Sequence, residues 1–326
     1  MSKSGFIAII GRPNSGKSTL LNSILGMELS IVTPKAQTTR EKVLGILTEK
    51  ENQIVFLDTP GIHRAKEGGL NHYMVNEARE ALEAPHLIWY LVDPFSALQH
   101  EIPVIDLIEK SHAQAPVCLL MNKMDLMGVA KKLSEAVLES FISQIQKEFE
   151  SRNILLHRTL KVSGLNQQGI RELLDLSWAE IPEGPHYYPD AEQVSDRPLR
   201  FFVAEKIRER LYYLLGEEVP YSCAVEIEKF DENAKPLCIE ANIYVERDSQ
   251  KGIVIGNGGK KIKEIGQTAR EAIEEFLGQK IFLGLKVKVL KDWTQQAESL
   301  KRMGYNLPEQ KKHLAKSSSK KRNDFI

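Results

Sequence analysis

The chain has 326 residues, of which 42% are hydrophobic and 27% are charged, and this is enough apolar material for two folded domains. Its 44 Lys/Arg and 44 Asp/Glu cancel, so net charge by itself indicates no partner. The distribution is uneven: residues 251–326 contain 17 Lys/Arg and 8 Asp/Glu, whereas the rest of the chain is acidic. This asymmetry predicts that the C-terminal part binds a polyanion.

The cysteines and the apolar runs indicate the compartment. Cys118, Cys223 and Cys238 are far apart, lie in apolar runs and lack metal-ligand spacing, so we expect buried thiols in a reducing environment. No apolar run is as long as a membrane span. Residues 1–11 are typical of a first strand rather than of a signal peptide. A cytoplasmic protein is expected.

The first part of the chain alternates strands and helices, which predicts an α/β domain with a mostly parallel sheet and helices on both faces. The expected strands are residues 6–10, 43–47, 53–58, 86–93, 116–123 and 154–163. The expected helices have apolar residues at helical spacing and are residues 17–25, 101–111 and 133–150.

The pattern changes after a segment with four prolines and one glycine. A helix, two strands, a short helix, a basic helix and a last strand follow, so the order predicts a compact α+β module. The final residues are basic, rich in serine and expected to be disordered. The proposed division is a first domain, a linker, a second domain and a tail, at residues 1–181, 182–198, 199–305 and 306–326.

The first glycine loop, GRPNSGKS, fits the pattern G-x-x-x-x-G-K-[ST] between a strand and a helix. In this pattern, backbone N–H groups and the helix N-terminus face phosphate oxygens. Lys17 is expected to reach the β- and γ-phosphates and Ser18 to offer its hydroxyl to Mg²⁺. The predicted nucleotide-binding residues of this loop are Gly11, Arg12, Pro13, Asn14, Ser15, Gly16, Lys17, Ser18 and Thr19.

The motif NKMD follows an apolar strand and favours guanine over adenine. A carboxylate can accept from both N1–H and the exocyclic amino group of guanine, an arrangement that adenine lacks, and we assign this role to Asp125. Asn122 and Lys123 are expected to brace the base and the loop. A VSG motif after the last strand of the domain places Ser163 and the Gly164 N–H near the guanine edge.

Two further motifs lie between these loops. In DTPG, Asp58 is expected to hold Mg²⁺ through water and the Gly61 N–H to meet the γ-phosphate. In AQTTR, one of Thr38 and Thr39 should close over Mg²⁺; Thr39 is favoured, and the alternative is a pair of solvated turn threonines. The predicted metal ligands are Ser18, Thr39 and Asp58, and the residues expected to act in catalysis are Asn14, Lys17, Thr39, Asp58 and Gly61.

The second glycine loop, IVIGNGGKKIKEIG, has no hydroxyl for Mg²⁺ after its lysines. Its G-x-x-G turn before a basic helix is typical of KH domains, which clamp about four nucleotides of single-stranded nucleic acid. Lysines would neutralise phosphates, and residues 253–255 would form an apolar floor under the bases. The predicted RNA-binding residues are Ile253, Gly256, Asn257, Gly258, Gly259, Lys260, Lys261 and Lys263.

The ordered motifs GRPNSGKS, AQTTR, DTPG, NKMD and VSG, with the second module, resemble the Era family of translation-factor-type GTPases with a C-terminal type II KH domain. The resemblance implies a monomeric GTPase that uses GTP/GDP and Mg²⁺. It also implies binding near the 3′ end of small-subunit ribosomal RNA during assembly of the small ribosomal subunit, with peripheral association at the inner membrane face. Asn257 departs from the lysine or arginine common at its position, which implies one phosphate contact fewer.

Two positions bear on the rate of hydrolysis. Ile62 follows DTPG, where many small GTPases have a water-orienting glutamine, so we expect slow intrinsic hydrolysis, on the order of 10⁻³ s⁻¹ or below. By its resemblance to related GTPases, Asn14 is a candidate ligand of K⁺ beside the phosphates; the alternative is a simple turn residue.

Other functions stay open at this point. One is an RNA chaperone whose nucleotide pocket is structural, and another is a GTPase that modifies or delivers tRNA. Trp293, after the last strand, is expected to pack at a domain edge, with stacking on RNA as the alternative.

Overall fold

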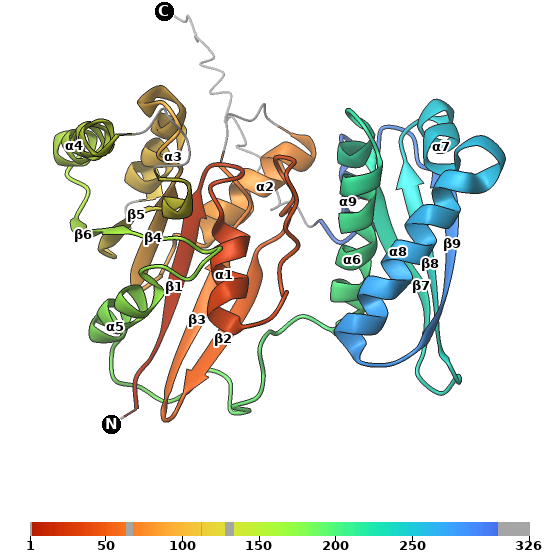
Figure 1. The fold of residues 1–326 in the computed structure, drawn as a ribbon, viewed down its shortest axis with the longest axis horizontal. Coiled ribbons are helices and arrows are strands. Elements are labelled where there is room, and N and C mark those ends of the chain that lie inside the picture. Colours follow the sequence, from red (N-terminus) through yellow and green to blue (C-terminus); the bar gives the residue numbers. More distant parts are fainter. Residues whose placement is uncertain (1, 63–67, 112, 128–133, 306–326) are drawn as a thin grey trace, which may run out of the picture.

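The first domain is a six-stranded sheet with helices on both faces (Figure 1). The computed structural model describes residues 2–62, 68–111, 113–127 and 134–305. All neighbouring strands pair in parallel except the antiparallel pair β2–β3. In sheet order the strands are β2 (Val43–Glu49), β3 (Asn52–Asp58), β1 (Ser4–Gly11), β4 (Leu87–Val92), β5 (Val117–Met121) and β6 (Leu156–Lys161).

Two apolar clusters hold the helices to this sheet, one on each face. Trp89 is fully buried in one of them, and its Nε1 donates to Ser177 Oγ at 3.1 Å. Packing on one face are α2 (Gly69–Glu80), α3 (Leu98–Ser111) and α4 (Glu135–Ser151); on the other are α1 (Lys17–Leu25) and α5 (Ile170–Glu180).

The second domain has the predicted order α-β-β-α-α-β, and its fold class is confirmed. Its sheet has the order β7-β8-β9, in which β7 and β8 are antiparallel and β8 and β9 are parallel. Three helices cover one face of this sheet, and on the other face Ala224 and Tyr244 pack against α2, Trp293 and Tyr305. The elements are α6 (Leu199–Leu214), β7 (Ala224–Asp231), β8 (Leu237–Val245), α7 (Asp248–Ile255), α8 (Lys260–Leu277) and β9 (Ile281–Val289), followed by α9 (Ala297–Arg302).

Cys118 and Cys223 are buried, but Cys238 is only half-buried, so the expectation of a buried thiol is wrong there. The reason is strand alternation. Ile239 and Ala241 of β8 face the helices, and Cys238 therefore lies on the opposite face of the sheet, at the end of β8 away from the buried Tyr244.

The segment 182–198 runs along the edge of the first sheet before α6 begins (Figure 1). Val194 O of this segment accepts a hydrogen bond from Ile46 N of β2 at 2.9 Å. The backbone N–H and C=O of Tyr188 both bond the side-chain amide of Gln53. Ser195 Oγ donates to a carbonyl of β2. These bonds cover an edge strand that would otherwise expose unpaired backbone groups.

The two domains share an apolar cluster. Residues of α2, including Tyr73 and Met74, pack against Trp293 and Tyr305 from the second domain. Trp293 is fully buried and its Nε1 donates to Ser222 O at 2.8 Å, so the expected packing role is confirmed. Among the described residues, no helix is both long enough and apolar enough to span a membrane.

Candidate functional site

The first glycine loop joins β1 to α1 at the carboxyl edge of the sheet. Gly11 has φ +153°, and a Cβ there would lie 2.4 Å from Leu91 O; Gly16 has φ +97°, and its Cβ would lie 2.2 Å from Asn122 Nδ2. Both positions therefore require glycine, because a side chain would collide with its neighbours. The resulting turn brings successive backbone amides to the start of α1.

Lys17 is buried at the base of this loop. Its Nζ donates to Arg12 O at 2.9 Å and to Gly11 O at 3.2 Å. Burial lowers the pKa of Lys17 to about 8, although the nearby Asp58 and Glu101 carboxylates act in the opposite direction. An ammonium held in a poorly solvated place interacts strongly with an anion such as a phosphate.

Three oxygen-bearing side chains meet beside Lys17. Ser18 Oγ donates to Asp58 Oδ2 at 2.8 Å and lies 3.0 Å from Thr39 Oγ1. Asp58 is fully buried, which raises its pKa, and its Oδ1 has no hydrogen-bond partner among the described residues. Hydroxyl and carboxylate oxygens are the ligands that Mg²⁺ prefers, so these residues fit that ion.

The other threonine of the pair is directed elsewhere. Thr38 is buried, its hydroxyl donates to Lys35 O at 2.8 Å, and it lies 2.7 Å from Thr33 Oγ1. Its hydroxyl therefore bonds within its own loop. The structure brings Thr39, and not Thr38, to Ser18.

The DTPG motif closes over the glycine loop. A Cβ on Gly61 would lie 2.5 Å from Pro13 Cα, so the two backbones are in close contact. Ile62 N donates to Gly11 O at 3.0 Å, and the Ile62 side chain is buried in the apolar cluster under the sheet. An apolar side chain directed into the core cannot orient a water molecule.

The NKMD and VSG motifs lie side by side at the ends of β5 and β6. Asn122 Nδ2 donates to Ser15 O at 2.8 Å, and its Oδ1 accepts from Gly164 N at 3.2 Å, so one side chain ties both loops to the phosphate loop. Ser163 Oγ donates to Asp125 Oδ1 at 2.5 Å. Lys123 Nζ pairs with Asp93 Oδ2 at 2.7 Å.

Part of the predicted nucleotide-binding set lines a cavity of about 270 Å³, with contributions from the glycine loop, the AQTTR segment, Gly61 and Lys123. Asp125, Ser163 and Gly164 do not line it. Not every side chain of the loop faces it. Arg12 Nη1 bonds Ser96 and lies 3.4 Å from the buried carboxylate of Glu101. Asn14, by contrast, lines the cavity; it is exposed, and its Nδ2 donates to Pro34 O at 3.1 Å. The cavity is also lined by Pro13, Gly16, Lys17, Ser18, Thr19, Thr39 and Gly61.

The second glycine loop forms a tight turn between α7 and α8. Gly256, Gly258 and Gly259 all have φ between +59° and +77°, and Gly259 N donates to Gly256 O at 3.1 Å. Asn257 at the tip is exposed. The turn presents its backbone to solvent at the start of a helix, where anions are favoured.

The lysines and the apolar residues around this turn differ in exposure. Lys260 and Lys263 are exposed, whereas Lys261 is half-buried and pairs with Glu264 at 2.7 Å. Ile253 is 51% exposed, but Val254 is fully buried in the core of the domain. The expectation that Val254 forms part of the apolar floor is therefore wrong, because this residue of α7 faces the sheet.

A groove of about 520 Å³ lies between α8 and β9. Sequence reasoning missed its second wall, since β9 follows the glycine turn by some twenty residues and meets α8 only in the folded domain. The available signal was Phe282, a large apolar residue in a lysine-containing strand, which is 54% exposed. The residues lining the groove include Ile262, Lys263, Gly266, Gln267, Arg270, Phe282, Leu283 and Leu285.

Comparison with known proteins decides the family. Residues 6–123 match a family model described as a 50S ribosome-binding GTPase, and residues 218–294 match a KH domain model. The chain is 41% identical over 305 residues to GTPase Era of Staphylococcus haemolyticus, an alignment that covers 93% of this chain and 97% of the relative. The chain belongs to the Era family of GTPases.

Solved structures of Era match the whole fold. An Era variant from Aquifex aeolicus bound to GDP and AlF₄⁻ is 37% identical, with a TM-score of 0.85, and the match covers 94% of this chain and 100% of that chain. Era in complex with MgGDPNP and nucleotides 1506–1542 of 16S ribosomal RNA matches with the same identity, coverage and TM-score. The expectation of an Era-type GTPase with a KH domain is confirmed, and this family member is a GTPase.

Proposed function

We propose that this Era family GTPase is a nucleotide-controlled switch that binds small-subunit ribosomal RNA and acts in assembly of that subunit. One observation carries the proposal: the chain joins the nucleotide cavity to an exposed G-x-x-G turn beside a groove, in the arrangement of the relative solved with 16S ribosomal RNA. The proposed units are residues 1–181, 182–198, 199–305 and 306–326.

GTP would bind with its phosphates on the first glycine loop. Lys17 would contact the β- and γ-phosphates, while Ser18, Thr39 and Asp58 would hold Mg²⁺, which supplies positive charge to the transferred phosphoryl group. The Gly61 N–H would bond the γ-phosphate. These residues lie together around one cavity or beside it, which supports the assignment.

The guanine base would lie against the NKMD and VSG loops. Asp125 would accept from two guanine donors, with Ser163 holding the carboxylate and Asn122 joining the loops. Hydrolysis without a partner would be slow, because the buried Ile62 cannot position water. K⁺ bound near Asn14 would add charge at the phosphates.

RNA would lie across the G-x-x-G turn and into the groove between α8 and β9. The glycines permit close approach of the sugar–phosphate backbone, and Lys260, Lys261 and Lys263 would neutralise phosphates. Ile253 and the apolar residues of the groove would contact bases.

RNA binding and nucleotide binding would be coupled through the contact between the domains. A coupling of about 1–3 kcal/mol is typical and must be reciprocal, so RNA would tighten GTP by the factor by which GTP tightens RNA. The measurement is RNA affinity with GDP and with a non-hydrolysable GTP analogue. Equal affinities would mean two independent domains.

The double variant Asn257→Asp/Gly258→Asp tests the RNA site. Two negative charges at the exposed tip should repel the phosphate backbone and abolish binding of a 16S 3′-end fragment, while GTP affinity stays intact. The charge-matched control is Ser143→Asp/Gln144→Asp on the exposed face of α4, which should bind RNA as the parent does. RNA binding by the first variant would contradict the proposed site.

Co-sedimentation tests the choice of subunit. The family model that matches the first domain is described as a 50S ribosome-binding GTPase. The relative that matches the whole chain was solved with 16S ribosomal RNA, and this complex supports the small subunit. Sedimentation of this monomer with the large subunit alone would overturn the choice. Cytoplasmic localisation with peripheral membrane association rests on the family resemblance alone, and cell fractionation tests it.

A further inference from the structure

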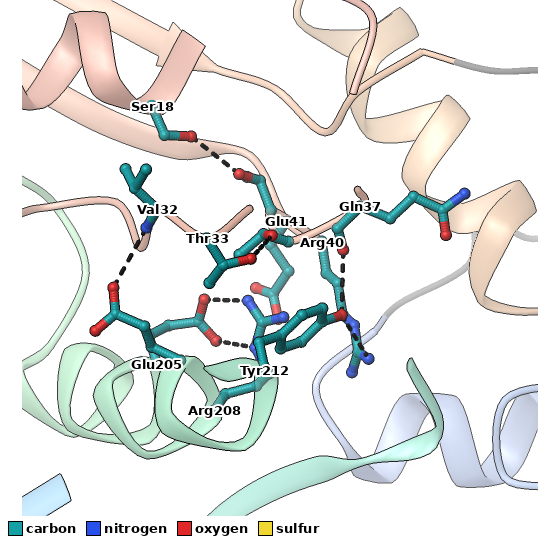
Figure 2. Close-up of polar contacts among 12 residues, drawn as sticks. Ser18, Val32, Thr33, Gln37, Arg40, Glu41, Glu205, Arg208 and Tyr212 are labelled. Atoms are coloured by element: carbon teal, nitrogen blue, oxygen red, sulfur yellow. Dashed lines mark hydrogen bonds and ion pairs between the residues drawn. The ribbon is translucent and has the colours of Figure 1, made fainter. Parts of the chain in front are cut away.

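The segment Glu28–Lys42, here named switch I, lies against the KH domain as well as against the nucleotide cavity (Figure 2). Helix α6 provides most of its support. Tyr213 Oη donates to Val32 O at 2.9 Å, Val32 N donates to Glu209 at 3.4 Å, and Lys35 Nζ bonds Leu215 O. The position of switch I is therefore set partly by the second domain.

Arg40 is the residue of switch I that reaches farthest into this contact. Its side chain is buried, and its guanidinium donates to Cys223 O at 2.7 Å, Tyr221 O at 2.8 Å and Pro220 O at 3.3 Å. It also lies 5.8 Å from the centre of the Trp293 ring. A planar guanidinium with several donors suits this set of carbonyls, which an ammonium could not reproduce.

A hydroxyl completes the set. Arg40 Nη2 donates to Tyr212 Oη at 3.3 Å, and Tyr212 Oη in turn donates to Gln37 O at 3.3 Å. One tyrosine of α6 therefore holds two points of switch I (Figure 2).

Arg40 directly follows Thr39. The Thr39 hydroxyl lies 3.0 Å from Ser18 Oγ in the nucleotide site, while the next side chain points into the KH domain. The space between switch I and α6, lined by Thr39, Arg40 and Arg208, measures only about 10 Å³, so these residues pack closely against the helix on this side. Anchoring Arg40 thus restrains the backbone that carries Thr39.

We propose that Arg40 is a positioning residue for GTP binding and hydrolysis: anchored on KH-domain carbonyls, it holds Thr39 at the Mg²⁺ site. This rests on the proposed function of Thr39 as a metal ligand. In this arrangement the KH domain stabilises the position that switch I takes when GTP is bound. A partner that moves the KH domain would then release Thr39 from the Mg²⁺ site.

The test compares affinities for Mg·GDPNP and for GDP in the full-length chain. Arg40→Met should weaken Mg·GDPNP by about 10-fold to 100-fold, as for other residues that orient a metal ligand, and should lower kcat, while GDP affinity is unchanged. Tyr212→Phe, which removes one hydroxyl and leaves the carbonyls, should give a smaller loss of the same kind. Thermal unfolding checks that each variant is folded.

Lys206→Met is the matched control. Lys206 is equally buried on α6 and crosses the same domain contact to Glu28 at 2.6 Å. Glu28 is the first residue of switch I, eleven positions before Thr39, so this ion pair does not hold the backbone next to Thr39 and the variant should bind both nucleotides as the parent does. Equal losses for GDP and GDPNP in Arg40→Met and Tyr212→Phe, or no loss in either, would overturn the proposal. The variant Thr39→Ala distinguishes failure of the Arg40 proposal from failure of the proposed function. If Thr39→Ala leaves Mg·GDPNP binding intact, Thr39 is not a metal ligand.

Discussion

Glu41, the next residue of switch I, should make the stability of this protein depend on pH. Its carboxylate is largely buried and lies 3.1 Å from Arg197. Burial raises the pKa of Glu41 to about 7; Arg197 opposes this, and the nearby carboxylates of Glu205 and Glu77 reinforce it. The substitution Glu41→Gln keeps the shape of the side chain and removes its ionisation.

The sign follows from the direction of the shift. The pKa of Glu41 rises on folding from an ordinary 4.5, so the folded state binds the proton more tightly and loses stability as pH rises through this window. Between about pH 5 and about pH 8 the penalty grows by about 2.5 kcal/mol. Glutamine carries no such penalty, and the variant should therefore gain stability relative to the parent as pH rises.

The assay is urea unfolding of parent and variant at several pH values. Other groups titrate in both proteins, so their effects largely cancel in the difference between the two free energies of unfolding. The free energy of unfolding of the variant, relative to that of the parent, should rise by about 2.5 kcal/mol from about pH 5 to about pH 8. A difference that stays constant across this range would contradict the raised pKa of Glu41 in the folded protein.

Three further predictions concern ligands. Asp125→Asn should weaken GTP by about 2–4 kcal/mol and shift preference toward xanthosine triphosphate, as measured by titration; unchanged GTP binding would remove Asp125 from the site. GTP turnover should rise when Na⁺ is replaced by K⁺, and Asn14→Ala should abolish the rise; equal rates in both ions would contradict a K⁺ site. Removing Lys260, Lys261 or Lys263 should each reduce the salt slope of RNA binding by about 0.7, and an unchanged slope would place that lysine away from phosphate.

The sequence by itself determined the features that depend on neighbouring residues. The phosphate loop, NKMD and the G-x-x-G turn are runs whose residue types are required by backbone geometry and by ligand chemistry, so they are recognisable without a fold. Period-two and helical patterns likewise predicted most strands and helices. Helices α2 and α5 were not predicted, although Leu70, Tyr73 and Met74 have helical spacing.

Only the tertiary structure decided which side chains meet across long stretches of chain. The sequence favoured Thr39 over its neighbour Thr38, but only the folded structure shows Thr39 beside Ser18 and Thr38 bonded within its own loop. Arg40 resembles any surface arginine until residues some 180 positions later supply its carbonyls. The same holds for the groove, whose second wall on β9 meets α8 only in the folded domain. Contacts between distant segments result from packing and leave no pattern in the local sequence.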